Sequence, residues 1–376
     1  MLSLKLCDLI SRMSKPYPAV GYSDYLKTNA LLDLQTLRSE EFKAHAHDEM
    51  LFIITHQTYE LWFKQILTEL NSVLDIYSKP VIQETAMATS VSRLHRVVEI
   101  LKLLVSQVTV LETMTPLDFL DFREFLYPAS GFQSVQFRLI ENKLGLKSTE
   151  RTTYNALPYT SFVNEKEREE LIQSEAVPSL FEHVDAWLAR TPFLQTENFD
   201  FWNSYQKAVE ALFNDDREIV LNNLLLNDES RARNLTEIDK NRETFHALFD
   251  PKQYEELRLS GGYRLSYQAL HATLLIILYR EQPALSLPFQ VITALQDIDE
   301  LMTTWRYRHS LMAHRMLGRK IGTGGSSGAQ YLKQATDRHR IFADFFNLAT
   351  FLIPRSRLPV LPKEIREKLG FFYTAR

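Results

Sequence analysis

A glycine-rich stretch, Gly318 to Gly328, is the most unusual candidate for chemistry in the chain, since it holds five of the 11 glycines. It is not a Walker A loop, because no Lys-Ser or Lys-Thr pair follows its last glycine. It is not a dinucleotide-binding fingerprint either, because a predicted helix precedes it rather than a strand. Two interpretations remain. It is a flexible connector between helices, or a mobile lid whose backbone N–H groups and Thr323 hydroxyl close over an anionic ligand.

Two histidines, His309 and His314, lie in the helix predicted just before this stretch, together with Arg306, Arg308 and Arg315. Basic side chains near a helix C-terminus complement the helix dipole, so they need no functional explanation. The two histidines are five residues apart and therefore ~140° out of phase around the helix, so they cannot both bind one metal ion. At most one is a ligand, a buried core histidine is the alternative, and spacing does not choose between the two positions.

Another histidine lies within an aromatic face. Phe52, His56, Tyr59 and Phe63 follow one another at helical spacing and share one side of a predicted helix. Aromatic walls beside one group that can donate or accept a hydrogen bond are what a pocket for a flat ligand needs. A buried aromatic stripe with one hydrogen-bonded histidine is the alternative.

An arginine lies on an otherwise apolar side of a short helix, where Arg123 follows Phe119 by four residues. A guanidinium group binds a carboxylate through two parallel hydrogen bonds, which suits the recognition of an amino acid. Asp118, Asp121 and Glu124 are close in the sequence, so a structural ion pair is the alternative interpretation.

Long helices must position these residues. Only 11 glycines and 14 prolines occur in 376 residues, fewer than many short strands would need, and no stretch alternates long enough for a strand. Apolar residues instead recur at helical spacing, so the sequence predicts an all-α fold. Asp48 is the expected N-cap of one helix, and Gly145 and Gly318 are expected to end two others. The expected helices are Asp48–Leu70, Val91–Val108, Leu117–Tyr127, Phe132–Leu144, Glu165–Glu175, Leu180–Leu188, Phe199–Phe213, Leu265–Tyr279, Phe289–Leu317 and Ala329–Phe346.

Composition and charge narrow the class of protein. Apolar residues make up 45% and charged residues 24% of the chain, as in a globular protein rather than a disordered one. The net charge of −4, from 43 basic and 47 acidic residues, argues against nucleic acid as a partner. Cys7 is the one cysteine, and residues 1–15 have no apolar signal-peptide core, so we expect a cytosolic protein. The longest apolar run, Leu274–Tyr279, is too short to cross a membrane.

Several long segments, taken together, resemble the tryptophan 2,3-dioxygenase family. They are Phe52–Leu67 (FIITHQTYELWFKQIL), Pro128–Gly145 (PASGFQSVQFRLIENKLG), Trp305–Gly328 and the element Tyr22-Ser-Asp-Tyr25-Leu. The resemblance is strong over about residues 20–145 and 290–335 and weaker over 146–265, and residues 1–17 match nothing recognisable.

The resemblance implies a cytosolic, all-α homotetramer that binds haem b, one per subunit, in a pocket buried between helices. It also implies insertion of both atoms of O₂ across the indole C2–C3 bond of L-tryptophan, giving N-formylkynurenine, the first step of the kynurenine pathway. We expect residues 18–145 and 236–376 to form the haem-binding helical core, 146–235 a smaller helical insertion and 1–17 an N-terminal extension. Neither nucleic acid nor a membrane is expected as a partner.

The resemblance further implies roles for individual residues. His309 corresponds to the axial ligand of the haem iron, a choice that spacing left open. His56 corresponds to the catalytic histidine that meets the indole N–H, and Arg123 to the residue that binds the substrate carboxylate. The other expected substrate-binding residues are Phe52, Phe119, Leu126, Ser130, Thr323 and, from a neighbouring subunit, Tyr22 and Tyr25.

Three other interpretations stay open at this point. A helical haem carrier or sensor would also bind haem through His309, but it would have no use for Arg123 and Thr323. A helical enzyme that binds a phosphate or a nucleotide through the glycine-rich stretch would bind no haem. A relative that acts on a neutral indole is disfavoured by Arg123 and Thr323, which suit a free amino acid.

Overall fold

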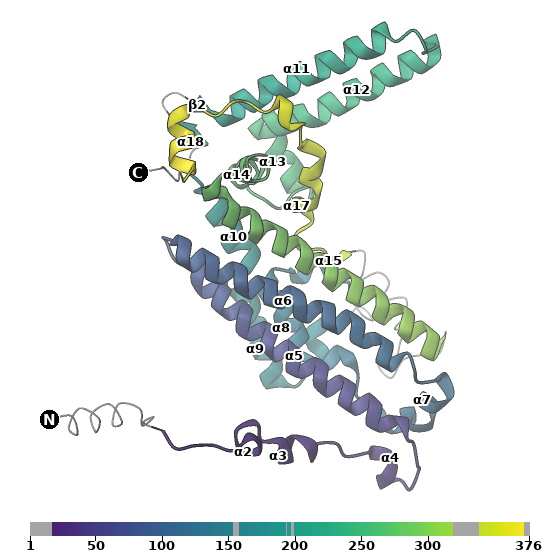
Figure 1. The fold of residues 1–376 in the computed structure, drawn as a ribbon. Helices are drawn as coiled ribbons and strands as arrows, with labels where there is room; N and C mark the ends of the chain where they lie inside the picture. Colours follow the sequence, from purple (N-terminus) through teal and green to yellow (C-terminus); the bar gives the residue numbers. More distant parts are fainter. Residues whose placement is uncertain (1–16, 153–157, 193, 197–198, 319–337, 372–376) are drawn as a thin grey trace, which may run out of the picture.

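The computed structural model of the chain describes residues 17–152, 158–192, 194–196, 199–318 and 338–371. Within these residues the regular structure is helical apart from two short strands, β1 (Gln195–Thr196) and β2 (Phe199–Asp200), which pair antiparallel (Figure 1). The prediction of an all-α fold is therefore confirmed. In the same part of the chain, no helix combines the length and the apolar character that crossing a membrane requires.

Three long helices form the centre of the molecule. They are α5 (Asp48–Tyr77), α6 (Glu84–Leu111) and α15 (Pro283–Leu317), and α6 packs along both of the others (Figure 1). Leu94, Leu101 and Leu104 of α6 recur at helical spacing and are buried in this contact region. The three helices are held in register by this shared apolar core, so residues on α5 and α15 keep fixed positions relative to each other.

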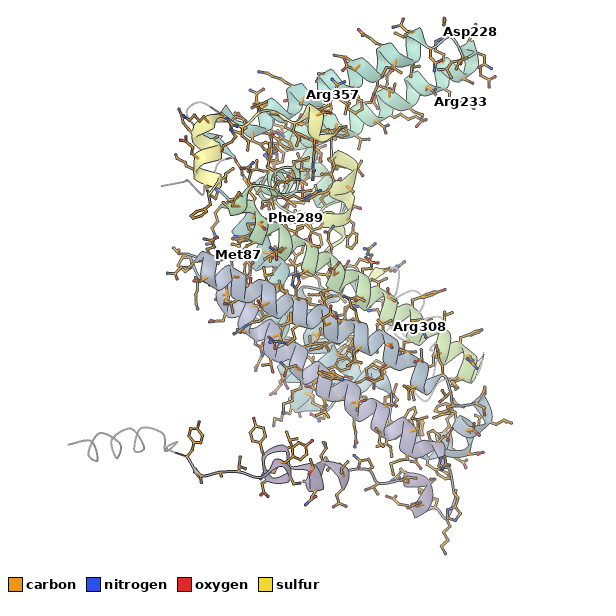
Figure 2. The ribbon with its side chains drawn as sticks, viewed as in Figure 1. Met87, Asp228, Arg233, Phe289, Arg308 and Arg357 are labelled. Atoms are coloured by element: carbon orange, nitrogen blue, oxygen red, sulfur yellow. The ribbon has the colours of Figure 1, made fainter. Side chains whose placement is uncertain are left out.

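The other helices surround this centre. α8 (Val135–Leu144) and α10 (Leu180–Ala189) pack against α5, α9 (Glu165–Ala176) packs against α8, and α14 (Tyr267–Leu278) packs against both α10 and α15. At one end α11 (Phe201–Asn222) and α12 (Asp228–Phe249) form an antiparallel pair that projects from the body (Figure 1), and Figure 2 shows Asp228 and Arg233 near its outer end. The remaining elements are α2 (Tyr22–Leu26), α3 (Thr28–Leu32), α4 (Arg38–Glu41), α7 (Pro116–Arg123), η1 (Glu124–Leu126), η2 (Gly131–Gln133), η3 (Ser148–Glu150), η4 (Tyr159–Phe162), α13 (Pro251–Leu259), α17 (Ala343–Asn347), η5 (Leu348–Phe351), η6 (Arg355–Arg357) and α18 (Lys363–Leu369).

A second apolar cluster gathers the ends of several elements around the candidate residues. Its buried members lie just before α5, at and just after the end of α6, in α7 and at the end of α15; they are Ala46, Leu111, Met114, Phe122 and Met316. Phe52, Phe119 and Leu126 pack against this cluster. Three expected pocket residues that are far apart in the sequence are therefore neighbours of the same core.

Local signals at helix ends position α7 and α8. Thr115 caps α7 in a capping box, in which its hydroxyl accepts from the Asp118 N–H while the Asp118 carboxylate accepts from the Thr115 N–H. Ser134 caps α8 by accepting a hydrogen bond from the Phe137 N–H. Gly145 ends α8 at φ 120°, where a Cβ atom would lie 2.8 Å from Ser179 Oγ, so this position requires glycine.

The structure confirms most of the expected helices and corrects their boundaries. Gly145 and Gly318 follow α8 and α15 as expected. However, α5 extends to Tyr77 and α15 begins six residues before Phe289, at Pro283. Asp48 is not the N-cap of α5 but its first residue, since His47 already has helical backbone angles and occupies the cap position.

Of the expected helix Ala329–Phe346, the structure confirms the last residues, 343–346, and contradicts the part just before them. Residues 339–342 are not helical, and α17 starts at Ala343. The Ile341 N–H donates to Asp299 Oδ1 at 2.8 Å instead of to a carbonyl one turn earlier, and the His339 carbonyl accepts from Arg306. These bonds to α15 replace the bonds that would continue a helix. The division of the chain at residues 145 and 235 stays a prediction.

Candidate functional site

The axial-ligand candidate, His309, lies on α15 with its ring partly buried, whereas His314, one and a half turns later, is exposed. The Nδ1 atom of His309 is buried, and burial lowers the pKa of this imidazole to about 4. His309 is therefore neutral at physiological pH, which is the state in which an imidazole binds a metal. Burial distinguishes the two histidines that spacing could not.

The histidine of the aromatic face, His56, lies on α5 and acts on His309. After burial, the repulsion that would arise if both imidazoles were protonated is the second cause that lowers the pKa of His309, so the two rings, from different helices, lie within electrostatic range of each other. Burial also lowers the pKa of His56 itself, while the Phe52 carbonyl and the Glu60 carboxylate act in the opposite direction. Its side chain nevertheless keeps an accessible surface, so it can meet a ligand.

One hydrogen bond fixes the tautomer of His56. The Nδ1 atom is 2.7 Å from the Phe52 carbonyl oxygen. A carbonyl oxygen can only accept, so Nδ1 carries the proton. In the neutral ring Nε2 is then an acceptor, able to receive a hydrogen bond from an N–H donor such as an indole.

Aromatic rings surround the same position. The Phe52 ring lies 4.1 Å from the His56 ring and 5.8 Å from the Phe119 ring, measured between centroids. Phe122 supports both phenylalanines from the buried side, at 5.5 Å from Phe52 and 5.4 Å from Phe119. The structure thus brings Phe52, His56 and Phe119 together and leaves a flat, apolar wall.

Arg123 lies at the C-terminal end of α7, one turn after Phe119, and is half-buried. Asp118, at the start of the same helix, accepts hydrogen bonds from the Thr115 backbone N–H at 3.0 Å and from the Thr115 hydroxyl at 2.6 Å. Leu126 follows in η1 and packs on the second apolar cluster. Arg123 and Phe119 thus follow one another on the same short helix, whose Phe119 and Phe122 rings form part of the aromatic wall.

The structure shows the surroundings of three of the remaining expected residues, Ser130, Tyr22 and Tyr25. Ser130 caps η2, with its hydroxyl accepting from the Phe132 N–H at 3.4 Å and its N–H donating to Gln133 Oε1 at 3.0 Å. Tyr22 and Tyr25 are 77% and 74% exposed on α2, which lies on an N-terminal arm apart from the helical body of its own chain (Figure 1). Thr323 lies outside the described residues.

Two side chains that the sequence did not single out support the site. Glu60, one turn after His56, accepts from Ser134 Oγ at 2.6 Å and from Gln136 Nε2 at 2.8 Å, which fixes the segment before α8 to α5. Trp305, one turn before His309, stacks on the His309 ring with centroids 5.2 Å apart and planes inclined by 20°. The i, i+4 spacing of Trp305 and His309 was the available signal for this stack.

Two of the basic residues of α15 are occupied by structural contacts. Arg306 Nη2 donates to Glu141 Oε1 at 2.8 Å and Arg306 Nη1 to the His339 carbonyl at 3.0 Å. Arg308, labelled in Figure 2, donates to Glu112 Oε2 at 2.9 Å just beyond the end of α6. Both therefore join α15 to neighbouring segments.

Comparison with known proteins decides the family. The model of the tryptophan 2,3-dioxygenase family matches residues 11–352. The chain belongs to the tryptophan 2,3-dioxygenase family. The tryptophan 2,3-dioxygenase of Bdellovibrio bacteriovorus is 57% identical over 95% of this chain and 99% of its own length. That of Alteromonas mediterranea is 48% identical over 96% and 99%, and that of Dictyostelium discoideum 47% over 94% and 89%.

Membership of the tryptophan 2,3-dioxygenase family implies a haem cofactor and O₂ as co-substrate. The residues present fit this group. His309 offers one neutral imidazole whose ring is held in place, and haem proteins use a single axial histidine when the opposite position of the iron must stay open. The apolar rings of Phe52 and Phe119 suit both a porphyrin and an indole.

Proposed function

We propose that this chain inserts both atoms of O₂ across the indole C2–C3 bond of L-tryptophan, giving N-formylkynurenine in the first step of the kynurenine pathway. One observation carries the proposal. A neutral His309 and a His56 whose Nε2 is an acceptor stand together beside an aromatic wall, in a chain of the tryptophan 2,3-dioxygenase family. The first histidine suits iron and the second suits an indole N–H.

The proposed cofactor is haem b, one per subunit, with His309 as its axial ligand. When bound, haem supplies the iron centre that reacts with O₂. The chain's own residues exclude water from this reaction, because Phe52, Phe119 and Leu126 present apolar surface. A neutral His309 is ready to bind without first losing a proton.

The substrate is held at both ends in this proposal. His56 Nε2 accepts the indole N–H, and the guanidinium group of Arg123 binds the α-carboxylate. Ser130 and Thr323 complete the amino-acid end as the family resemblance implies. Fixing both ends of tryptophan lowers the entropic cost of bringing C2 and C3 to the oxidant.

The proposal includes a cytosolic homotetramer. The N-terminal arm, residues 17–37, exposes Tyr22, Tyr25 and Leu32, and α2 and α3 contain no buried residue. An open, mostly apolar groove of about 750 Å³ lies between α5 and α6, lined in part by Leu61, Trp62 and Leu103. Exposed apolar surface of this extent is typical of an interface, and we propose that further copies of this chain cover it. Tyr22 and Tyr25 would then reach the site of a neighbouring subunit.

Isotope labelling tests the proposed reaction. Purified, haem-loaded, reduced protein is incubated with L-tryptophan and ¹⁸O₂, and the product is analysed by mass spectrometry. We expect one O₂ consumed per tryptophan and both labelled atoms in N-formylkynurenine. A red protein that leaves tryptophan unchanged would instead indicate a haem carrier. A preference for neutral indoles over tryptophan would indicate a relative with another substrate.

A further inference from the structure

Among the described residues, no protein group accepts a hydrogen bond from the buried Nδ1 of His309. A metal-binding histidine normally donates its second ring N–H to a carboxylate, a carbonyl or water, which fixes the ring plane. Within the described residues, the contact that the protein itself makes to orient this imidazole is therefore packing against the ring.

Trp305 supplies such a contact. Its indole is nearly parallel to the His309 ring, inclined by 20° at 5.2 Å between centroids. Because the two residues are one helical turn apart on α15, the stack forms within a single rigid element. Rotation of the imidazole out of this plane would lose the stacking contact.

Three further rings hold Trp305 itself. Phe137 of α8 lies at 5.0 Å, Tyr59 of α5 at 5.9 Å and Phe63 of α5 at 6.4 Å, the last two edge-on. Tyr59 and Phe63 are buried, and the Tyr59 hydroxyl donates to the Leu104 carbonyl of α6 at 3.0 Å. The indole is thus packed among side chains from α5 and α8 and is partly buried.

The backbone of the same turn is also fixed. Arg306 donates to Glu141, which is fully buried on α8, and to the His339 carbonyl. Trp305 and Arg306 therefore attach two sides of this turn of α15 to α8. The stack on His309 rests on a turn that has little freedom to move.

We propose that Trp305 is a positioning residue that fixes the plane of the His309 imidazole by stacking, in place of a hydrogen bond to Nδ1. The proposal rests on the proposed function, because it takes His309 to be the axial ligand. With Trp305 shortened, the ring can rotate and water can reach Nδ1, so the imidazole binds iron in several orientations and less tightly.

The test compares Trp305→Leu with Trp305→Phe, which keeps a ring. Trp202→Leu is a matched control, because Trp202 stacks on His271 with centroids 3.5 Å apart in a different part of the core. The first readout is the rate of haem transfer to apomyoglobin. The second is the iron–histidine stretching band in the resonance Raman spectrum of the reduced protein without substrate.

We expect Trp305→Leu to lose haem ~10–100-fold faster, the range for removing a residue that orients a ligand. We also expect it to broaden the iron–histidine band, while Trp305→Phe, whose smaller ring stacks less well, falls between Trp305→Leu and the parent, and Trp202→Leu changes neither readout. An unchanged band and haem loss rate in Trp305→Leu would overturn the proposal. Equal effects in Trp202→Leu would overturn it too, since they would show that any loss of a buried stacked ring destabilises the fold and releases haem. An absence of any iron–histidine band in the parent protein would instead contradict the proposed function.

A second measurement does not depend on the folding of Trp305→Leu. In His309→Gly, added imidazole can occupy the vacated position and is followed by its effect on the haem spectrum. We expect the affinity for imidazole to fall several-fold when Trp305→Phe, a mild substitution, is combined with His309→Gly. Equal affinities in the two backgrounds would show that the Trp305 ring does not hold the imidazole.

Discussion

At the scale of single residues, the site depends on the protonation state and the tautomer of its two histidines. The Phe52 carbonyl fixes the proton of the neutral His56 ring on Nδ1, and burial lowers the pKa of both His56 and His309, which favours their neutral forms. The sequence could predict the residue types and the shared face of Phe52 and His56. It could not choose between His309 and His314, because burial depends on how α15 packs against the rest of the molecule.

Arg123 is predicted to bind the substrate carboxylate. Arg123→Ala should weaken the apparent affinity for L-tryptophan by ~1.5–3 kcal/mol, the range for a hydrogen bond to a charged group. The measurement is KM for tryptophan, with Arg123→Lys as the variant that keeps a charge. Tryptamine lacks the carboxylate and provides the control, since its turnover should be equally poor in both proteins. If Arg123→Ala leaves KM and kcat for tryptophan unchanged, Arg123 has another role.

His271 of α14 should make stability depend on pH. It stacks on Trp202, its Nε2 atom is buried without a partner among the described residues, and burial lowers its pKa to about 3. The unfolded chain takes up this proton near pH 6.5, so the folded state loses stability as pH falls from about 6.5 towards 3. The loss is at most ~1.4 kcal/mol per pH unit.

Urea unfolding of His271→Phe at several pH values checks this expectation. The difference in the free energy of unfolding between variant and parent should shift in favour of the variant as pH falls below 6.5. His45→Gln, at an exposed position, should run parallel to the parent protein. Parallel curves for His271→Phe would show that His271 is not the titrating group.

At the scale of elements, α15 is the helix on which the site is built. The sequence could predict α15, which is 35 residues long, because apolar residues recur along it at helical spacing. The same pattern predicts α5 and α6. By contrast α12 was missed, because it has few apolar residues and is held to α11 by polar contacts such as Arg217–Asp239 at 3.0 Å and Arg242–Asn214 at 2.7 Å. The break at residues 339–342 was missed because bonds to Asp299 and Arg306 on a distant segment cause it.

We expect the stability of the packing between α8 and α15 to depend on the Glu141 carboxylate. It is fully buried among Arg138, Arg151 and Arg306, and although burial opposes its charge, these arginines hold its pKa well below the ordinary value. Glu141→Gln would leave the buried arginines without their carboxylate and should cost ~3–5 kcal/mol of unfolding free energy.

Urea unfolding near pH 7 measures this cost. Glu99→Gln, which breaks an exposed pair with Lys102 at 2.8 Å, is the control and should cost under ~1 kcal/mol. Because the folded-state pKa of Glu141 is lowered, its contribution is present above about pH 4.5 and is lost as pH falls further. A Glu141→Gln protein as stable as Glu99→Gln would show that the buried arginines do not depend on this carboxylate.

At the scale of the whole molecule, we propose that the N-terminal arm of one chain completes the site of another. Tyr22 and Tyr25 are exposed on an arm whose last residues are fixed beside the site, since Gln57, next to His56, donates to the Leu34 carbonyl at 3.2 Å. The sequence motif Tyr22-Ser-Asp-Tyr25-Leu could mark the arm but could not say which copy of the chain it serves.

Complementation tests whether the arm acts on a neighbouring subunit. A chain that starts after Tyr25 lacks the arm residues, and His309→Ala lacks the proposed axial ligand, so each should be nearly inactive as a purified protein. After the two are unfolded and refolded together, mixed oligomers should regain activity, because an intact arm from one chain meets an intact His309 in the other. Activity no greater than the sum of the separate proteins would place the arm elsewhere.

The most direct measurement of the central claim is the absorption spectrum of the reduced protein with His309→Ala and His314→Ala compared side by side. The parent protein and His314→Ala should each bind one haem per chain with the spectrum of an iron held by one histidine. His309→Ala should lose tightly bound haem while its far-ultraviolet circular dichroism stays helical. A His309→Ala protein that keeps the parent spectrum would contradict the claim that His309 binds the haem iron.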